Sequence, residues 1–205
     1  MSSIQRHAPS TLALRGMLGG IAALAVLLLL APTVVVIVVS FTNGYSLKFP
    51  PPGYSLRWYA ALGDAWQLQF AALNSFKVAS AAMLVSVALG VPAAMGIARS
   101  EKALARVLDS LFMSPLILPA LAFGLASLIF FSRLNVGLSL TTLVIGHSVV
   151  GVPYVIRTTV AALSQLPPAL LESSASLGAD SAYTFRRITL PLIAPGIAAG
   201  AFITF

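Results

Sequence analysis

The stretch GMLGGIAALAVLLLLAPTVVVIVVSF, from Gly16 to Phe41, holds 26 consecutive residues without a charge. A helix needs about 20 apolar residues to cross the roughly 30 Å hydrocarbon core of a bilayer, so this run is long enough to span a membrane. The polar residues 42–44 end it. Arg6 and Arg15 precede it as in a secretory signal, but the run is far longer than a signal's apolar region. We interpret it as a retained first transmembrane span.

The rest of the chain repeats this pattern. Hydrophobic residues make up 59% of the sequence and charged residues 8%, against about 25% charged in typical soluble domains. The gaps between charged residues give five candidate spans: Gly16 to Lys48, Val78 to Ala98, Ser110 to Ser132, Leu134 to Ile156 and Ile188 to Phe205. The last holds only 18 residues, about 27 Å of helix. The sequence therefore predicts an all-α, polytopic transmembrane helical bundle with five hydrophobic segments.

The basic residues indicate a membrane topology rather than a nucleic-acid partner. Lys and Arg outnumber Asp and Glu by 12 to 5, but they are scattered singly between the spans. A cytoplasmic N-terminus leaves eight basic residues inside: Arg6, Arg15, Arg99, Lys102, Arg106, Arg157, Arg186 and Arg187. Four fall outside: Lys48, Arg57, Lys77 and Arg133. This excess favours a cytoplasmic N-terminus, with an external loop over 42–75 and an internal stretch over 157–187.

The internal stretch carries the signals of a helix, a sharp turn and a second helix. Pro167 and Pro168 suit a helix start over 169–177, because proline is tolerated in a first turn. Gly178 can adopt the left-handed conformation that ends a helix. Asp180 then stands where an N-cap is expected, ahead of residues 181–187.

This stretch also resembles a known family. The run Glu172-Ser-Ser-Ala-Ser-Leu-Gly178, followed after nine residues by Ile188-Thr-Leu-Pro191, resembles the EAA motif of ABC importer permeases. Only Ser173 and Ser174 differ from the fixed positions, where the family usually has alanines. A second stretch, from Phe49 to Tyr59 and followed by Asn74-Ser75, is similar to the spermidine/putrescine permease subfamily.

The resemblance implies a permease subunit of an ABC importer in the bacterial inner membrane. It would pair with a second permease subunit, with two cytoplasmic ATPase subunits and with an external solute-binding protein, and its solute would be a polyamine. The internal stretch would be the cytoplasmic coupling loop that docks in a cleft of the ATPase. The resemblance assigns these residues to the loop: Leu170, Leu171, Glu172, Gly178, Ala179, Asp180, Leu190 and Pro191.

The resemblance also implies a division of the chain into two parts. Residues 1–77 would hold the N-terminal tail, the first span and the external loop. Residues 78–205 would hold a permease transmembrane core with the coupling loop 157–187. Permeases of this type continue through a complete fifth span and a sixth, so we expect a C-terminally truncated chain whose 205 residues do not transport even when partner proteins are supplied. Near its end, Gly196 and Gly200 form a small-xxx-small pair that permits close helix packing.

The candidate residues for a solute pathway lie in the fourth run. His147 is ionisable within a predicted span, where such residues often face a water-filled path. Ser148 and Tyr154 are further candidates, although both also suit ordinary helix packing. We expect no metal site, because neither His7 nor His147 has a neighbouring ligand in the sequence.

We expect no enzymatic activity and no cofactor. The chain has no phosphate-binding G-x-x-x-x-G-K-[ST] motif, so ATP hydrolysis belongs to a partner. Two alternatives to an ABC permease remain: a secondary transporter or channel not driven by ATP, and a structural membrane scaffold. Acidic residues at broken helices would favour the first alternative.

Overall fold

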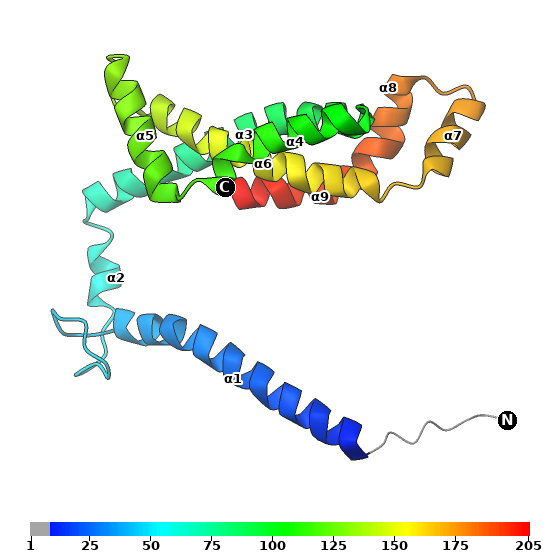
Figure 1. Ribbon diagram of the computed structural model, residues 1–205. Coiled ribbons are helices and arrows are strands. Elements are labelled where there is room, and N and C mark those ends of the chain that lie inside the picture. The colour runs from blue at the N-terminus through cyan, green and yellow to red at the C-terminus, as the bar shows by residue number, and fades with distance from the viewer. Residues whose placement is uncertain (1–8) are drawn as a thin grey trace. The chain divides into compact units, whose positions relative to one another are not determined.

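The computed structural model describes residues 9–205, which form helices joined by turns and by a longer loop between α1 and α2 (Figure 1). Arg6 and His7 lie outside the described residues. The chain divides into two units, of which the first ends at Gln69 and the second begins at Phe70. Within residues 9–205, four helices are long and apolar enough to cross a membrane, or five if a bent pair counts as one span. The predicted all-α, multi-pass class is confirmed.

The first unit contains the helix α1, Pro9–Ser40. Every residue from Leu14 to Val34 is exposed, although this part of the helix is almost entirely apolar. Such a surface is suited to a bilayer rather than to water, because exposing so many apolar side chains to water would cost a large amount of free energy. Pro32 is tolerated inside the helix, as proline commonly is in membrane spans.

After α1 the chain folds back on itself and then becomes helical again. The Asn43 amide donates to the Gly53 carbonyl at 3.0 Å, and the Ser55 amide donates to the Phe41 carbonyl at 2.7 Å. A short helix, α2, follows at Arg57–Ala61. The expected external loop over 42–75 is therefore too long, since α3 already begins at Trp66. Residues 66–77 contain neither proline nor glycine, so the polar and charged residues there do not interrupt the helix.

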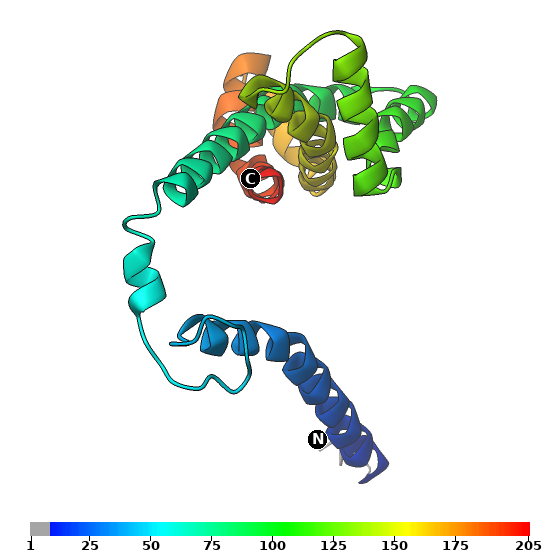
Figure 2. The ribbon, with the colours of Figure 1, turned by 90° about the vertical axis from the view of Figure 1, so that its left-hand side faces the viewer.

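The second unit is organised around α3 (Trp66–Arg99), α6 (Leu140–Ser164) and α9 (Leu190–Thr204). Helices α6 and α9 lie side by side (Figures 1 and 2). Val155, which is fully buried, packs between glycines of two helices: a Cβ on Gly90 would lie 2.8 Å from its Cβ, and one on Gly200 would lie 2.8 Å from its Cα. Gly196 packs equally closely on Ala162. The close approach predicted for the Gly196 and Gly200 pair is confirmed.

The third hydrophobic run is not one straight span. It is divided between α4, Lys102–Ile117, and α5, Ala120–Arg133, whose axes differ by 94°. The break falls at Leu118, which is extended (ψ 138°) because a following proline disfavours the helical conformation. The expected single helix over 110–132 is therefore wrong in its course. That helix was predicted only from the absence of charged residues, and this criterion takes no account of prolines.

The last two runs also differ from their expected bounds. Helix α6 begins at Leu140 rather than Leu134 and continues past Arg157 to Ser164, because a charge on an exposed face does not end a helix. It ends where Leu166 precedes Pro167. The fifth run was predicted to hold only 18 residues. In the structure its helix begins further toward the N-terminus, and the helical stretch Ser181–Thr204 has 24 residues. That stretch is about 36 Å long, enough to cross the hydrocarbon core.

Candidate functional site

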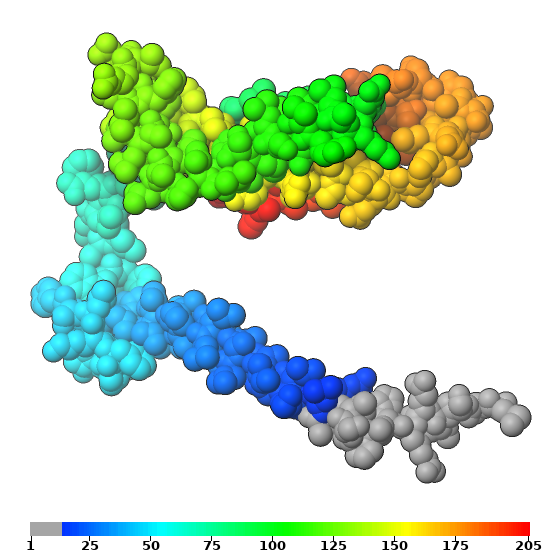
Figure 3. Space-filling model, in the orientation of Figure 1, coloured from blue at the N-terminus to red at the C-terminus, as the bar shows by residue number. Residues whose placement is uncertain are grey.

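A helical hairpin between α6 and α9 forms the most distinctive surface feature of the second unit. It consists of α7 (Pro168–Ser176) and α8 (Ser181–Thr184). It lies at the opposite end of this unit from α5 and projects beyond the neighbouring helices (Figures 1 and 3). Pro167 is the N-cap of α7, and Pro168 occupies the first turn, where its missing N–H has no partner to lose. The helix start predicted from these prolines is confirmed.

The turn of the hairpin depends on Gly178. Its φ of +79° lies in the left-handed region, which costs residues with a side chain about 1–2 kcal/mol. The Gly178 amide donates to the Ala175 carbonyl at 2.9 Å, and the Ala179 amide donates to the Ser174 carbonyl at 3.1 Å. These two bonds form a Schellman motif, which satisfies the last carbonyls of α7. The helix end predicted at this glycine is confirmed.

The second helix begins with a side-chain cap. The Asp180 carboxylate accepts a hydrogen bond from the Tyr183 amide at 2.6 Å, as its sequence position predicts. Ser174 is buried, and its Oγ lies 2.7 Å from Thr184 Oγ1, so this hydrogen bond joins the two helices. Sequence comparison treated Ser174 only as a small replacement for alanine. Its contact with Thr184 depends on the folded hairpin, so no local sequence signal marked it.

The exposed surface of the hairpin combines apolar side chains with the carboxylates of Glu172 and of Asp180, the N-cap of α8. Leu177 is 87% exposed, and Leu170 and Leu171 are partly exposed. Glu172 is exposed and forms no salt bridge within the described residues. A shallow hollow on the hairpin is lined by both helices, including Leu170, Ser174, Leu177, Ala179, Asp180 and Tyr183. The structure thus brings six of the eight predicted loop residues together on one hairpin: Leu170, Leu171, Glu172, Gly178, Ala179 and Asp180.

Leu190 and Pro191 lie apart from that face, at the start of α9. A π-helix, η1 (Phe185–Thr189), connects α8 to α9. The Leu190 amide donates to the Phe185 carbonyl five residues back, which widens the turn. This widening lies directly ahead of Pro191, which has no N–H to continue the ladder. The hairpin is therefore continuous with the apolar helix α9 through one irregular turn.

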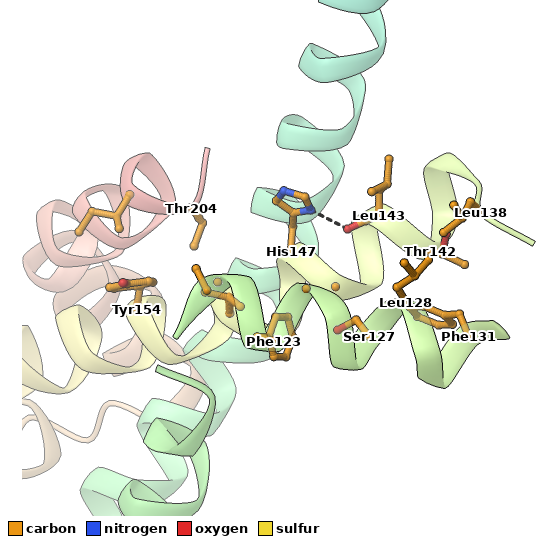
Figure 4. Close-up of a pocket in the computed structure, with 16 residues that line it drawn as sticks. Phe123, Ser127, Leu128, Phe131, Leu138, Thr142, Leu143, His147, Tyr154 and Thr204 are labelled. Atoms are coloured by element: carbon orange, nitrogen blue, oxygen red, sulfur yellow. Dashed lines mark hydrogen bonds between the residues drawn. The ribbon is translucent and has the colours of Figure 1, made fainter. Parts of the chain in front are cut away.

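The second unit also contains a cavity of about 540 Å³ between α5, α6 and the end of α9. Figure 4 shows aromatic residues of α5, Phe123 and Phe131, facing α6, with Thr204 contributed by α9. Of the three predicted pathway residues, His147 and Tyr154 line this cavity. Ser148 does not line it and is instead buried. Within residues 9–205, its hydroxyl has no hydrogen-bond partner.

The hydrogen bond of His147 determines which ring nitrogen carries the proton. His147 Nδ1 lies 2.8 Å from the Leu143 carbonyl oxygen, one turn earlier in α6 (Figure 4). A carbonyl oxygen only accepts, so Nδ1 must donate. In the neutral ring, Nε2 is then a hydrogen-bond acceptor. The residues that line the cavity include no Asp, Glu, Lys or Arg within the described part of the chain.

Comparison with known proteins identifies similar chains. The family model described as "Binding-protein-dependent transport system inner membrane component" matches residues 86–205. The molybdenum transport system permease protein ModB of Mycobacterium tuberculosis is 33% identical over 149 residues, covering 67% of this chain and 56% of its own length. The spermidine/putrescine transport system permease protein PotC of Escherichia coli K12 is 25% identical over 174 residues, covering 85% of this chain and 66% of its own.

A third relative is more similar over a shorter stretch. The inner membrane ABC transporter permease protein YdcU of Escherichia coli K12 is 55% identical over 53 residues, 26% of this chain and 17% of its own length. The chain spans little more than half the length of the molybdenum permeases that it matches. All three names describe transport permeases rather than enzymes, in agreement with the expectation that the chain has no enzymatic activity.

Proposed function

The chain belongs to the family of binding-protein-dependent transport system inner membrane components, and from that premise we propose that it is a permease subunit of an ABC importer. The observation that carries the proposal is the capped hairpin of α7 and α8, which continues into the apolar helix α9. The hairpin offers a partner exposed leucines and an unpaired carboxylate, Glu172. A rigid element with such a face is suited to transmit the movement of a docked ATPase to a membrane helix.

The proposed partners follow from this role. Two ATPase subunits bind the hairpins of this chain and of a second permease subunit, and an external solute-binding protein delivers the solute. The hairpin then lies in the cytoplasm, as does the N-terminus, and the protein resides in the bacterial inner membrane. Leu170, Leu171 and Leu177 pack against the ATPase, Glu172 pairs with a basic group there, and Gly178 with Asp180 maintains the turn.

The proposed orientation is testable because the chain contains no cysteine. Leu177 and Leu47 are 87% and 86% exposed, so single Leu177→Cys and Leu47→Cys variants make a matched pair. In intact cells, a membrane-impermeant maleimide should label Cys at 47 and should reach Cys at 177 only after permeabilisation. The reverse pattern would contradict the orientation.

We propose a polyamine as the solute to be tested first. The external-loop sequence and the similarity to a permease named for spermidine and putrescine support this choice. The cavity adds support, because Phe123, Phe131 and Tyr154 present aromatic rings that attract ammonium groups. His147 Nε2, as an acceptor, suits an amine donor. An oxyanion such as molybdate is the competing choice, supported by the similarity to ModB.

Uptake assays separate these solutes. This chain, extended by the complete fifth span and the sixth span of the permeases that it resembles and reconstituted with an ATPase and a binding protein, should accumulate labelled putrescine in an ATP-dependent manner. A Glu172→Arg change should abolish this uptake while membrane insertion is retained. Accumulation of molybdate alone would replace the polyamine proposal without affecting the permease proposal. Uptake that follows an ion gradient with no ATPase present would instead establish the alternative of a secondary transporter.

A further inference from the structure

The segment that follows the first span is unusually rich in aromatic residues. Both tryptophans of the chain and three of its five tyrosines lie between Tyr45 and Trp66. We call Phe41–Tyr59 the aromatic loop. Its large apolar side chains are mostly exposed, among them Tyr45, Leu47, Phe49 and Tyr54. Tyr and Trp concentrate where a membrane meets water, because each combines an apolar ring with a polar group.

The aromatic loop is held against the last turn of α1. Ser40 Oγ and Tyr59 Oη are 2.7 Å apart, and the rings of Phe41 and Tyr59 stack with centroids 5.3 Å apart. Together with the backbone bonds from Asn43 to Gly53 and from Ser55 to Phe41, these contacts close the loop on itself. The depth of the loop in a membrane is therefore set by the depth at which α1 ends.

The length of α1 places that end at the level of the lipid headgroups. The span Leu14–Ser40 has 27 residues, so it is about 40 Å long. The hydrocarbon core is about 30 Å thick, and the bilayer is about 40–45 Å thick with its headgroup regions. A helix of this length that is centred in the bilayer ends among the headgroups, and the loop attached to it lies there too.

The Arg57 side chain is held by two aromatic rings in a position suited to bind an anion at the level of the lipid headgroups. Its guanidinium carbon lies 4.5 Å from the ring centroid of Tyr45 and 4.6 Å from that of Trp58. The two rings contact each other edge to face, and the Trp58 indole N–H donates to the Gly44 carbonyl at 3.3 Å, so the pair is fixed. Within the described residues, the Arg57 side chain has no hydrogen bond or salt bridge. Its planar donors therefore remain available for a phosphate.

We propose that the aromatic loop is embedded in the membrane–water interface, and that Arg57, stacked on Tyr45 and Trp58, binds the phosphate of an anionic lipid headgroup. Charge favours this occupant, because the chain contains no acidic residue before Asp64 while the loop carries both Lys48 and Arg57. The exposed Phe49 and Tyr54 give the loop the apolar contacts that the acyl-chain boundary accepts.

Tryptophan fluorescence tests the proposal on the full chain reconstituted in vesicles. A Trp66→Phe change leaves Trp58 as the single fluorophore. The vesicles contain phosphatidylcholine and phosphatidylglycerol, with bromine placed near the headgroup or deep in the acyl chains of one lipid at a time. Shallow bromine should quench Trp58 more strongly than deep bromine, and brominated phosphatidylglycerol more strongly than brominated phosphatidylcholine. Arg57→Gln should lower this lipid preference by about fivefold while the depth profile stays the same.

The matched control is Lys48→Gln, which removes the same charge from an exposed loop residue that has no aromatic partner. It should retain most of the preference for phosphatidylglycerol. Equal losses in the Lys48 and Arg57 variants would indicate a diffuse charge effect and would overturn the Arg57 site. Quenching of Trp58 by aqueous acrylamide but by neither brominated lipid would overturn the interfacial location, because it would place the loop in water.

Discussion

Ser174 and Thr184 join the two helices of the hairpin through hydroxyl groups 2.7 Å apart. Ser174 is buried and Thr184 partly buried, so either single truncation leaves the other hydroxyl without its partner. A buried group left unpaired costs about 1–3 kcal/mol, whereas removal of both groups is nearly neutral. The bond therefore makes α7 and α8 one mechanical element rather than two linked helices.

We predict that Ser174→Ala and Thr184→Val each loosen the hairpin by about 1–3 kcal/mol and that the double variant is less affected than the sum. Amide hydrogen exchange over residues 174–184 of the full chain measures this. Ser176→Ala is the control, because the Ser176 hydroxyl bonds only to Glu172 of its own helix. Equal loss of protection in the Ser174 and Ser176 variants would contradict a role for the bond between the helices.

Gly178 should tolerate asparagine better than alanine. A Cβ at this position meets no atom within 4 Å, so the cost of a substitution arises from the positive φ alone. Alanine should weaken binding of the ATPase subunit about tenfold, as expected for 1–2 kcal/mol, and asparagine by less, because it enters the left-handed region more easily. Binding to the chain in lipid nanodiscs is the measurement. Equal weakening by alanine and asparagine would argue against a conformational cause.

Gly200→Ala should destabilise the packing of α6 and α9. Its Cβ would contact Thr158 Oγ1 and the Val155 backbone, and such overpacking costs about 1–3 kcal/mol. Gly96→Ala is the control, because Gly96 lies in helix α3 with open space around it. That change should be neutral or stabilising by up to about 1 kcal/mol. Thermal unfolding in detergent compares the two, and an unchanged midpoint for Gly200→Ala would contradict the packing described.

His147 should act through Nε2 rather than Nδ1 if the cavity belongs to the solute pathway. Glutamine places its amide near the position of Nε2, whereas asparagine places its amide near that of Nδ1, which bonds to Leu143. His147→Gln should therefore retain uptake, and His147→Asn should lose about fivefold to tenfold, the effect of one hydrogen bond. Better uptake by the asparagine variant would show that only the bond within the helix matters.

The hairpin was predictable from sequence because local residues determine it. Pro168, Gly178 and Asp180 each impose their conformation through their own covalent structure or through a partner a few residues away. The break at Leu118 also has a local cause, the proline that follows it. It was missed because the spans were predicted from the absence of charged residues and not from the positions of prolines. The helix end predicted at Arg157 was wrong for another reason: a charged residue on the exposed face of α6 does not end the helix.

The cavity was not predictable, because it depends on how three helices pack. His147 and Ser148 are neighbours in sequence, yet they point about 100° apart around α6, so one lines the cavity and the other is buried. The positions of α5 and α9 decide which face of α6 lines the cavity and which face is buried. The contact between Ser174 and Thr184 has the same origin, since it requires the turn at Gly178 to be formed first.

The most direct test of the central proposal is cross-linking from the hairpin to the ATPase. In the assembled complex, a photoreactive maleimide on Leu177→Cys should cross-link to the ATPase subunit, because this side chain projects from the proposed docking face. The same reagent on the equally exposed Leu47→Cys, in the aromatic loop, should not. Cross-linking at 177 alone is the predicted result. Failure at 177, or equal cross-linking at both positions, would contradict the account of the hairpin as the ATPase-docking element.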